Sequence, residues 1–174
     1  MEAYLIDTMF ASALWDEGDS DHSSALDFVT KAATSGDLIY VSRITLAEIE
    51  YGYKLYISTE PERRAKAELA MRAFKAIRDV GKDTIEPYAE IRAALFRQFA
   101  PRDAKLRVKN VRPERLIDQT TGLELGIQEN DLWIAAIAVE HNMTLVSGDR
   151  MRHIKQVYPR LKFFNWRATS STSK

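Results

Sequence analysis

The chain has 174 residues, of which 45% are hydrophobic and 29% are charged, as expected for one compact domain with a single core. Its 25 basic residues balance its 25 acidic residues, so the overall charge does not indicate a nucleic-acid partner. The sequence contains no cysteine, which excludes disulfides, thiolate nucleophiles and zinc–thiolate sites. It shows neither a basic, apolar leader nor a membrane-length apolar stretch. We therefore expect a cytoplasmic protein that does not enter the membrane.

The sequence begins with a short apolar strand over Tyr4–Ile6. Asp7 and Thr8 follow, a pair that favours a helix start, and a helix is expected across Met9–Trp15. After an acidic turn, the pattern predicts a second helix over His22–Thr34, which ends at Ser35-Gly36. An acidic residue thus lies at the carboxyl end of the first strand.

The next elements repeat this strand and helix order. Leu38–Ser42 is predicted to form a strand, and Arg43–Gly52 a helix with an apolar face and with Glu48 near its first turns. Pro61–Val80 has the stripe of a long amphipathic helix. Asp83–Pro87 is expected to be a short strand or turn.

The least regular part of the chain is Ala100–Gly126, which follows a helix predicted over Tyr88–Gln98. Between Arg102 and Arg115 it has six basic residues against two acidic ones. Such a run either contacts phosphates or is simply a solvated loop, since lysine and arginine neutralise a nucleic-acid backbone without reading its sequence. The residues expected to contact substrate phosphates are Arg43, Lys105, Arg107, Lys109 and Arg112.

An apolar helix over Asp131–Val139 is expected to be buried on most sides, with Asn130 or Asp131 as its cap. A turn at His141-Asn142 is expected to follow this helix. Thr144–Ser147 is then predicted to form a buried, parallel strand. Asp149 follows that strand. In open α/β sheets, ligands bind beyond the carboxyl ends of the strands.

A short helix over Met151–Val157 and a strand over Leu161–Phe164 complete the pattern. Because strands alternate with helices, we predict an α/β fold, a three-layer α/β/α sandwich around a central, mostly parallel sheet. The expected organisation is a single domain over residues 1–166, followed by a polar, disordered tail over residues 167–174.

Four acidic residues, Asp7, Glu48, Asp131 and Asp149, fall at strand ends or in early helical turns of separate segments. In a parallel sheet such positions meet at one edge. Like charges held together resist joint ionisation unless a cation neutralises them. An all-oxygen site favours Mg²⁺ or Mn²⁺, which suits phosphodiester hydrolysis. Ser147, two residues before Asp149, could hold a metal-bound water or simply end a strand.

Each of these acids taken alone has a structural interpretation, because an aspartate at a helix start satisfies backbone N–H groups. Glu129 is interpreted as an outer neighbour of the site. The three histidines share no spacing typical of a metal site. Trp15 and Trp133 are expected in the core or in a dimer interface.

The segments that contain the acids resemble the four acidic motifs of PIN-domain ribonucleases, particularly the VapC-type toxins of bacterial toxin–antitoxin pairs. The motifs occur in the family's order and cover about residues 1–164. They are Ile6–Thr8, Val41–Gly52, Asn130–Ala136 and Leu145–Asp149.

This resemblance implies an endoribonuclease that depends on Mg²⁺ or Mn²⁺, with Asp7, Glu48, Asp131 and Asp149 as metal ligands. It also implies a homodimer silenced by a cognate antitoxin. The chain departs from the family at Met9, where asparagine is common, and at Ser147, where threonine is common. Met9 motivates an alternative, a binding module with little catalysis. It also disfavours a haloacid-dehalogenase-like phosphatase, which needs an acid at that position.

Overall fold

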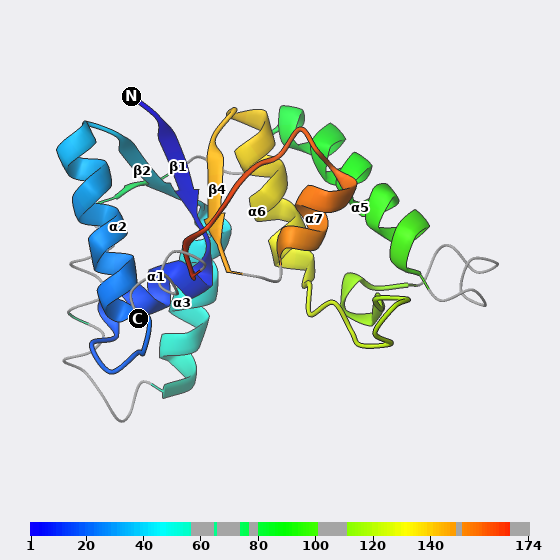
Figure 1. Ribbon diagram of the computed structural model, residues 1–174, viewed down its shortest axis with the longest axis horizontal. Helices are drawn as coiled ribbons and strands as arrows, with labels where there is room; N and C mark the ends of the chain where they lie inside the picture. Colours follow the sequence, from blue (N-terminus) through cyan, green and yellow to red (C-terminus); the bar gives the residue numbers. More distant parts are fainter. Residues whose placement is uncertain (57–64, 66–73, 77–79, 101–110, 149–150, 168–174) are drawn as a thin grey trace.

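The computed structural model of the chain describes residues 1–56, 65, 74–76, 80–100, 111–148 and 151–167. They contain a five-stranded sheet with the order β3-β2-β1-β4-β5, in which every neighbouring pair is parallel (Figure 1). The strands are β1 (Ala3–Ile6), β2 (Leu38–Val41), β3 (Lys75–Ala76), β4 (Thr144–Ser147) and β5 (Lys162–Asn165).

Helices cover both faces of the sheet. Figure 1 shows α1, α2 and α3 to one side of the strands and α5, α6 and α7 to the other. This arrangement confirms the predicted three-layer α/β fold. The α-helices are α1 (Thr8–Trp15), α2 (His22–Ser35), α3 (Arg43–Tyr56), α5 (Ile85–Phe99), α6 (Glu129–Glu140) and α7 (Arg152–Val157), with 3₁₀ turns η1 (Lys82–Thr84) and η4 (Pro113–Arg115).

Alternate residues of the central strands separate the core into two halves. Leu5 and Leu145 belong to the half packed under α5, α6 and α7. Ile6 and Val146 belong to the half that contains Phe10 and Trp166, whose rings meet edge to face with centroids 5.1 Å apart. Consecutive residues at the centre of the sheet are therefore buried on both faces, which explains why Leu5-Ile6 and Leu145-Val146 are apolar pairs rather than alternating apolar and polar residues.

Local sequence signals set most of the element ends. The Asp7 side chain caps α1, because its Oδ1 accepts a hydrogen bond from the Phe10 backbone N at 2.7 Å. The Ser42 Oγ accepts one from the Thr45 backbone N at 3.0 Å at the start of α3. Gly36 ends α2 in the left-handed conformation, with a φ of 73°. Asn142, at the turn before β4, has a φ of 53°, which asparagine tolerates better than most residues.

The helix predicted over Pro61–Val80 falls mainly outside the described residues, and its final part is wrong. Lys75–Ala76 instead forms β3 at the edge of the sheet, paired in parallel with Tyr40 and Val41. The edge of β2 offers backbone hydrogen-bond donors and acceptors to a segment that lies beside it. Hydrogen bonds between such distant residues cannot be predicted from a local pattern of apolar residues.

The segment around Pro87 also differs from the prediction. Residues 82–84 form a 3₁₀ turn and not a strand, and α5 starts at Ile85, three residues before the predicted start. Proline is tolerated there because N–H groups in the first helical turn have no partner within the helix. The cap of α6 is Gln128, whose backbone N donates to Oδ2 of Asp131 at 2.7 Å. Neither Asn130 nor Asp131 therefore occupies the cap position itself.

The irregular stretch before α6 is described from residue 111 onward. Its backbone is fixed to the end of α5, since the Ile117 N donates to the Phe99 carbonyl at 3.2 Å. A short antiparallel bridge joins Ile117 to Glu124, and Leu116, Leu125 and Ile127 are buried. This stretch is therefore part of the core. No helix in the described part of the chain has the length and apolar character needed to cross a bilayer.

Replacement of Leu145 by alanine should lower the free energy of unfolding by about 2–5 kcal/mol, because a fully buried side chain on a central strand leaves a cavity. The measurement is urea unfolding followed by circular dichroism. Leu123→Ala is the matched control, since Leu123 is 69% exposed and its loss should change stability by less than about 0.5 kcal/mol. Equal effects of the two substitutions would contradict this assignment of the core.

Candidate active site

A pocket of about 150 Å³ opens at the carboxyl ends of β1 and β4. Four of the predicted site residues line it, namely Asp7, Glu48, Asp131 and Ser147. They come from separate parts of the chain, as the edge of a parallel sheet requires. The full lining comprises Asp7, Thr8, Met9, Glu48, Gln128, Asp131, Ser147, Gly148 and Met151.

Asp7 is the most buried acid of the pocket, with 4% of its surface exposed. Its backbone N donates to the Val146 carbonyl at 3.2 Å, which extends the pairing of β1 with β4 by one bond. Its Oδ1 accepts from the Phe10 N at 2.7 Å, and its Oδ2 accepts from the Ser147 Oγ at 2.5 Å. A buried charge needs such donors, and the amino end of α1 favours a negative group.

Glu48 is held by side chains from two other helices. The Thr8 hydroxyl donates to its Oε2, and the Asn130 Nδ2 donates to its Oε1 at 2.8 Å. Glu48 therefore ties α1, α3 and α6 together at the pocket. These roles of Thr8 and Asn130 were not predicted from the sequence. The available signal was that each stands directly beside a predicted acid, Asp7 and Asp131 respectively.

The donor chemistry of the pocket fits a hard divalent cation, because all of the described charged groups that line it are carboxylates. Among the described residues, no three acidic or histidine side chains form a group tight enough to hold an ion by themselves. Mg²⁺ commonly keeps several waters and takes only one or two protein carboxylates. Asp7, Glu48 and Asp131 suit that kind of binding. The predicted fourth acid, Asp149, lies outside the described residues and follows Gly148, which lines the pocket.

The predicted phosphate-contacting residues do not line this pocket where the structure describes them. Arg43 is exposed at the start of α3, and Arg112 is exposed just before η4. Lys105, Arg107 and Lys109 fall outside the described residues. Of the histidines, His22 donates through Nδ1 to the Ala13 carbonyl at 3.0 Å and His153 packs edge-on against Phe99.

A polar network flanks the pocket at the start of α6. The Arg92 Nη1 lies 2.9 Å from Oε1 of Glu129, and the Tyr88 hydroxyl donates to the same oxygen. The Tyr88 ring stacks on the Trp133 ring with centroids 3.7 Å apart. Burial raises the pKa of the Tyr88 phenol, and its hydrogen bond to Glu129 raises the pKa further. Tyr88 therefore stays protonated at neutral pH, and Glu129 has its partners here rather than in the acidic pocket.

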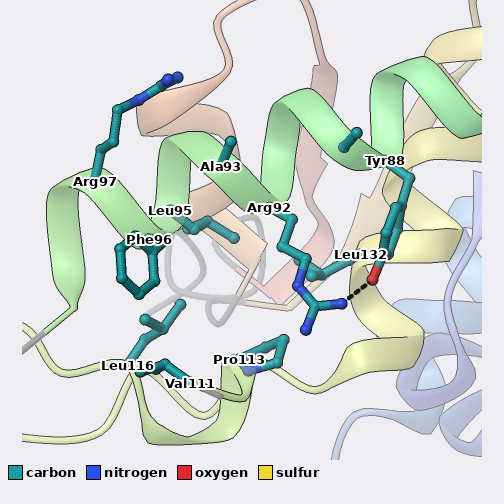
Figure 2. Close-up of a pocket in the computed structure, with 11 residues that line it drawn as sticks. Tyr88, Arg92, Ala93, Leu95, Phe96, Arg97, Val111, Pro113, Leu116 and Leu132 are labelled. Atoms are coloured by element: carbon teal, nitrogen blue, oxygen red, sulfur yellow. Dashed lines mark hydrogen bonds between the residues drawn. The ribbon is translucent and has the colours of Figure 1, made fainter. Parts of the chain in front are cut away.

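A larger, mainly apolar pocket of about 600 Å³ lies between α5 and residues 111–116. Figure 2 shows Leu116, Val111 and Pro113 on one side of it and Leu95 and Phe96 on the other. Arg92 points toward Pro113 and is bonded to Tyr88, so the aromatic network borders this pocket as well. No predicted site acid lines it.

Three comparisons with known proteins bear on this site. A family model described as the PIN domain matches residues 4–158. The structure is similar to VapBC2 from Rickettsia felis bound to a promoter DNA fragment, with a TM-score of 0.64 and 21% identity over 94% of this chain and 98% of that chain. It is also similar to DNA-bound VapBC from Salmonella typhimurium, with a TM-score of 0.61 and 17% identity over 95% of this chain and 99% of that one.

VapBC-1 from nontypeable Haemophilus influenzae is similar at a TM-score of 0.59, with 16% identity over 95% of this chain and 98% of that chain. Identities this low show a shared fold and nothing more specific. No curated protein sequence matches the chain significantly. Because the family model spans most of the chain, this chain belongs to the PIN-domain family, a family of nucleases.

Proposed function

We propose that this protein is an endoribonuclease that hydrolyses RNA phosphodiester bonds with Mg²⁺ or Mn²⁺ and acts as the toxin of a toxin–antitoxin pair. The observation that carries the proposal is the convergence of Asp7, Glu48 and Asp131 in one pocket of a PIN-domain fold. The described charged residues that line the pocket are all carboxylates, which are poorly suited to bind an RNA strand directly but would suit a divalent ion.

In this proposal, Asp7, Glu48, Asp131 and Asp149 hold the ion. A bound divalent ion lowers the pKa of the attacking water and stabilises charge on the departing oxygen. The hydrogen-bond donors of the protein position the carboxylates that would bind the ion. Ser147 and the Phe10 N fix both oxygens of Asp7, while Thr8 and Asn130 fix both oxygens of Glu48. Carboxylates fixed by such donors are preorganised and need not reorient when the ion arrives.

The proposed partners are an antitoxin protein and a second copy of the chain. The similar structures from Rickettsia felis, Salmonella typhimurium and Haemophilus influenzae are all named as VapBC, and two of them hold DNA. Their names support a partner that blocks the nuclease, which a free toxin would need in its own cell. Size-exclusion chromatography with light scattering tests the proposed homodimer.

Substitution of Asp7 or Asp131 by asparagine should reduce RNA cleavage in Mg²⁺ by ~10²-fold or more, because the transition state loses an ion-anchored contact. Asparagine caps a helix about as well as aspartate, so Asp7→Asn should keep α1 and the fold. The measurement is the initial rate of cleavage of a labelled single-stranded RNA, with circular dichroism of each variant as a folding check.

Asp27→Asn is the matched control for both substitutions, since Asp27 is exposed on α2. Its rate should equal that of the parent protein. Cleavage by both site variants at the parent rate would refute the assignment. A parent protein that takes up no Mn²⁺ in calorimetry and cuts no RNA would instead favour the binding-module alternative, for which Met9 in the pocket lining is the supporting observation.

Replacement of Asn130 by alanine should weaken Mn²⁺ binding by ~10- to 100-fold, because Glu48 loses the donor that orients its Oε1. Isothermal titration with Mn²⁺ measures the affinity in the absence of RNA, so the readout does not depend on turnover. Gln98→Ala, at an exposed position of α5, is the control. An unchanged Mn²⁺ affinity in Asn130→Ala would show that this hydrogen bond does not position the ligand.

A further inference from the structure

Arg167, directly beyond the last strand and its Trp166, lies beside Gly148 at the edge of the acidic pocket. A methyl group built on Gly148 would lie 3.7 Å from both the Cδ and the Nη1 of Arg167 and 3.8 Å from the Cε of Met9. Gly148 and Met9 both line the pocket. The guanidinium therefore lies in van der Waals reach of the pocket wall, at the point where the chain leaves β4 toward Asp149.

Two contacts fix the direction of this side chain. Its Nε lies 2.9 Å from Oδ2 of Asp21, which precedes α2. Its guanidinium carbon lies 5.3 Å from the centre of the buried Trp166 ring, within the range of a cation–π contact. The side chain keeps 37% of its surface exposed. Asp21 thus contacts the Nε side, and the Nη1 end is the part directed to Gly148.

We propose that Arg167 binds a backbone phosphate of the RNA at the corner of the acidic pocket, an inference that rests on the proposed function. The planar guanidinium presents paired donors that match a phosphate. The described charged groups that line the pocket are all carboxylates, which repel a phosphate wherever an ion does not bridge them. A cation beside Gly148 reduces that repulsion at this edge of the pocket.

The competing interpretation is structural, with the ion pair between Arg167 and Asp21 serving only to hold the end of the chain against the segment before α2. The two interpretations predict different consequences for the two partners. Loss of either partner breaks the ion pair, but only the loss of Arg167 removes the cation. Asp21→Asn is therefore the matched control for Arg167→Ala, and Arg160→Ala, at an exposed arginine that lies near Glu90, controls for net charge.

The experiment measures binding of a fluorescent single-stranded RNA by anisotropy across a series of salt concentrations. All variants carry Asp131→Asn so that the RNA is not cut. Arg167→Ala should weaken binding about 10-fold and reduce the slope of log K against log salt by about 0.7, the value for one phosphate contact on a single strand. Asp21→Asn and Arg160→Ala should stay within about threefold of their parent, with the slope unchanged.

Arg167→Lys and Arg167→Gln keep the proposal falsifiable should the alanine variant fail to fold, as judged by thermal unfolding. Lysine should keep the salt slope of the parent with weaker binding, and glutamine should lower the slope by about 0.7, as alanine does. Equal loss of affinity in Arg167→Ala and Asp21→Asn, or no loss in either, would overturn the proposal. If the protein with its native Asp131 cuts no RNA in Mg²⁺ or Mn²⁺ and the Asp131→Asn parent binds no RNA, the proposed function itself fails, which is a separate result.

Discussion

The parallel pairing of β1 with β4 is the constraint on which the site depends. The register places Ile6 beside Val146, and one further bond from the Asp7 N to the Val146 carbonyl continues it to the strand ends. Asp7 and Ser147 meet there although 140 residues separate them. Because side chains alternate between the two faces, a slip of one residue would exchange Leu5 and Ile6 between the two halves of the core. Core packing therefore fixes the geometry of the pocket.

The sequence was sufficient to predict the three-layer fold and the convergence of Asp7, Glu48 and Asp131. Asp7 follows a short apolar strand, while Glu48 and Asp131 lie in early turns of helices, and a parallel sheet brings such positions to one edge. The helix ends at Gly36 and Asn142 were predictable for a similar reason, because local conformation alone decides them. In each of these cases the residues that indicate the local structure are neighbours in the sequence.

The features that could not be predicted depend on contacts between distant residues. Lys75–Ala76 becomes a strand because β2 has a free edge beside it, and nothing in its own sequence requires this. Asn130 was interpreted as a helix cap, whereas its amide reaches Glu48 on another helix, 82 residues away. Arg167 was assigned to the tail after the domain, and its ion pair with Asp21 depends on how the last strand returns next to α1 and α2. Side-chain partners of this kind follow from the completed fold.

The hydrogen bonds of the pocket explain how carboxylates can be held near one another before any cation arrives. Asp7, Glu48 and Asp131 each accept hydrogen bonds from neutral donors of the protein, which stabilise a charged oxygen without adding a compensating charge. The mutual repulsion therefore remains, and it favours any cation that enters. The same field opposes an RNA strand. Since the chain as a whole has no net charge, its overall charge does not offset that repulsion. Recruitment of a polyanion therefore depends on the bound ion and on local groups of cations.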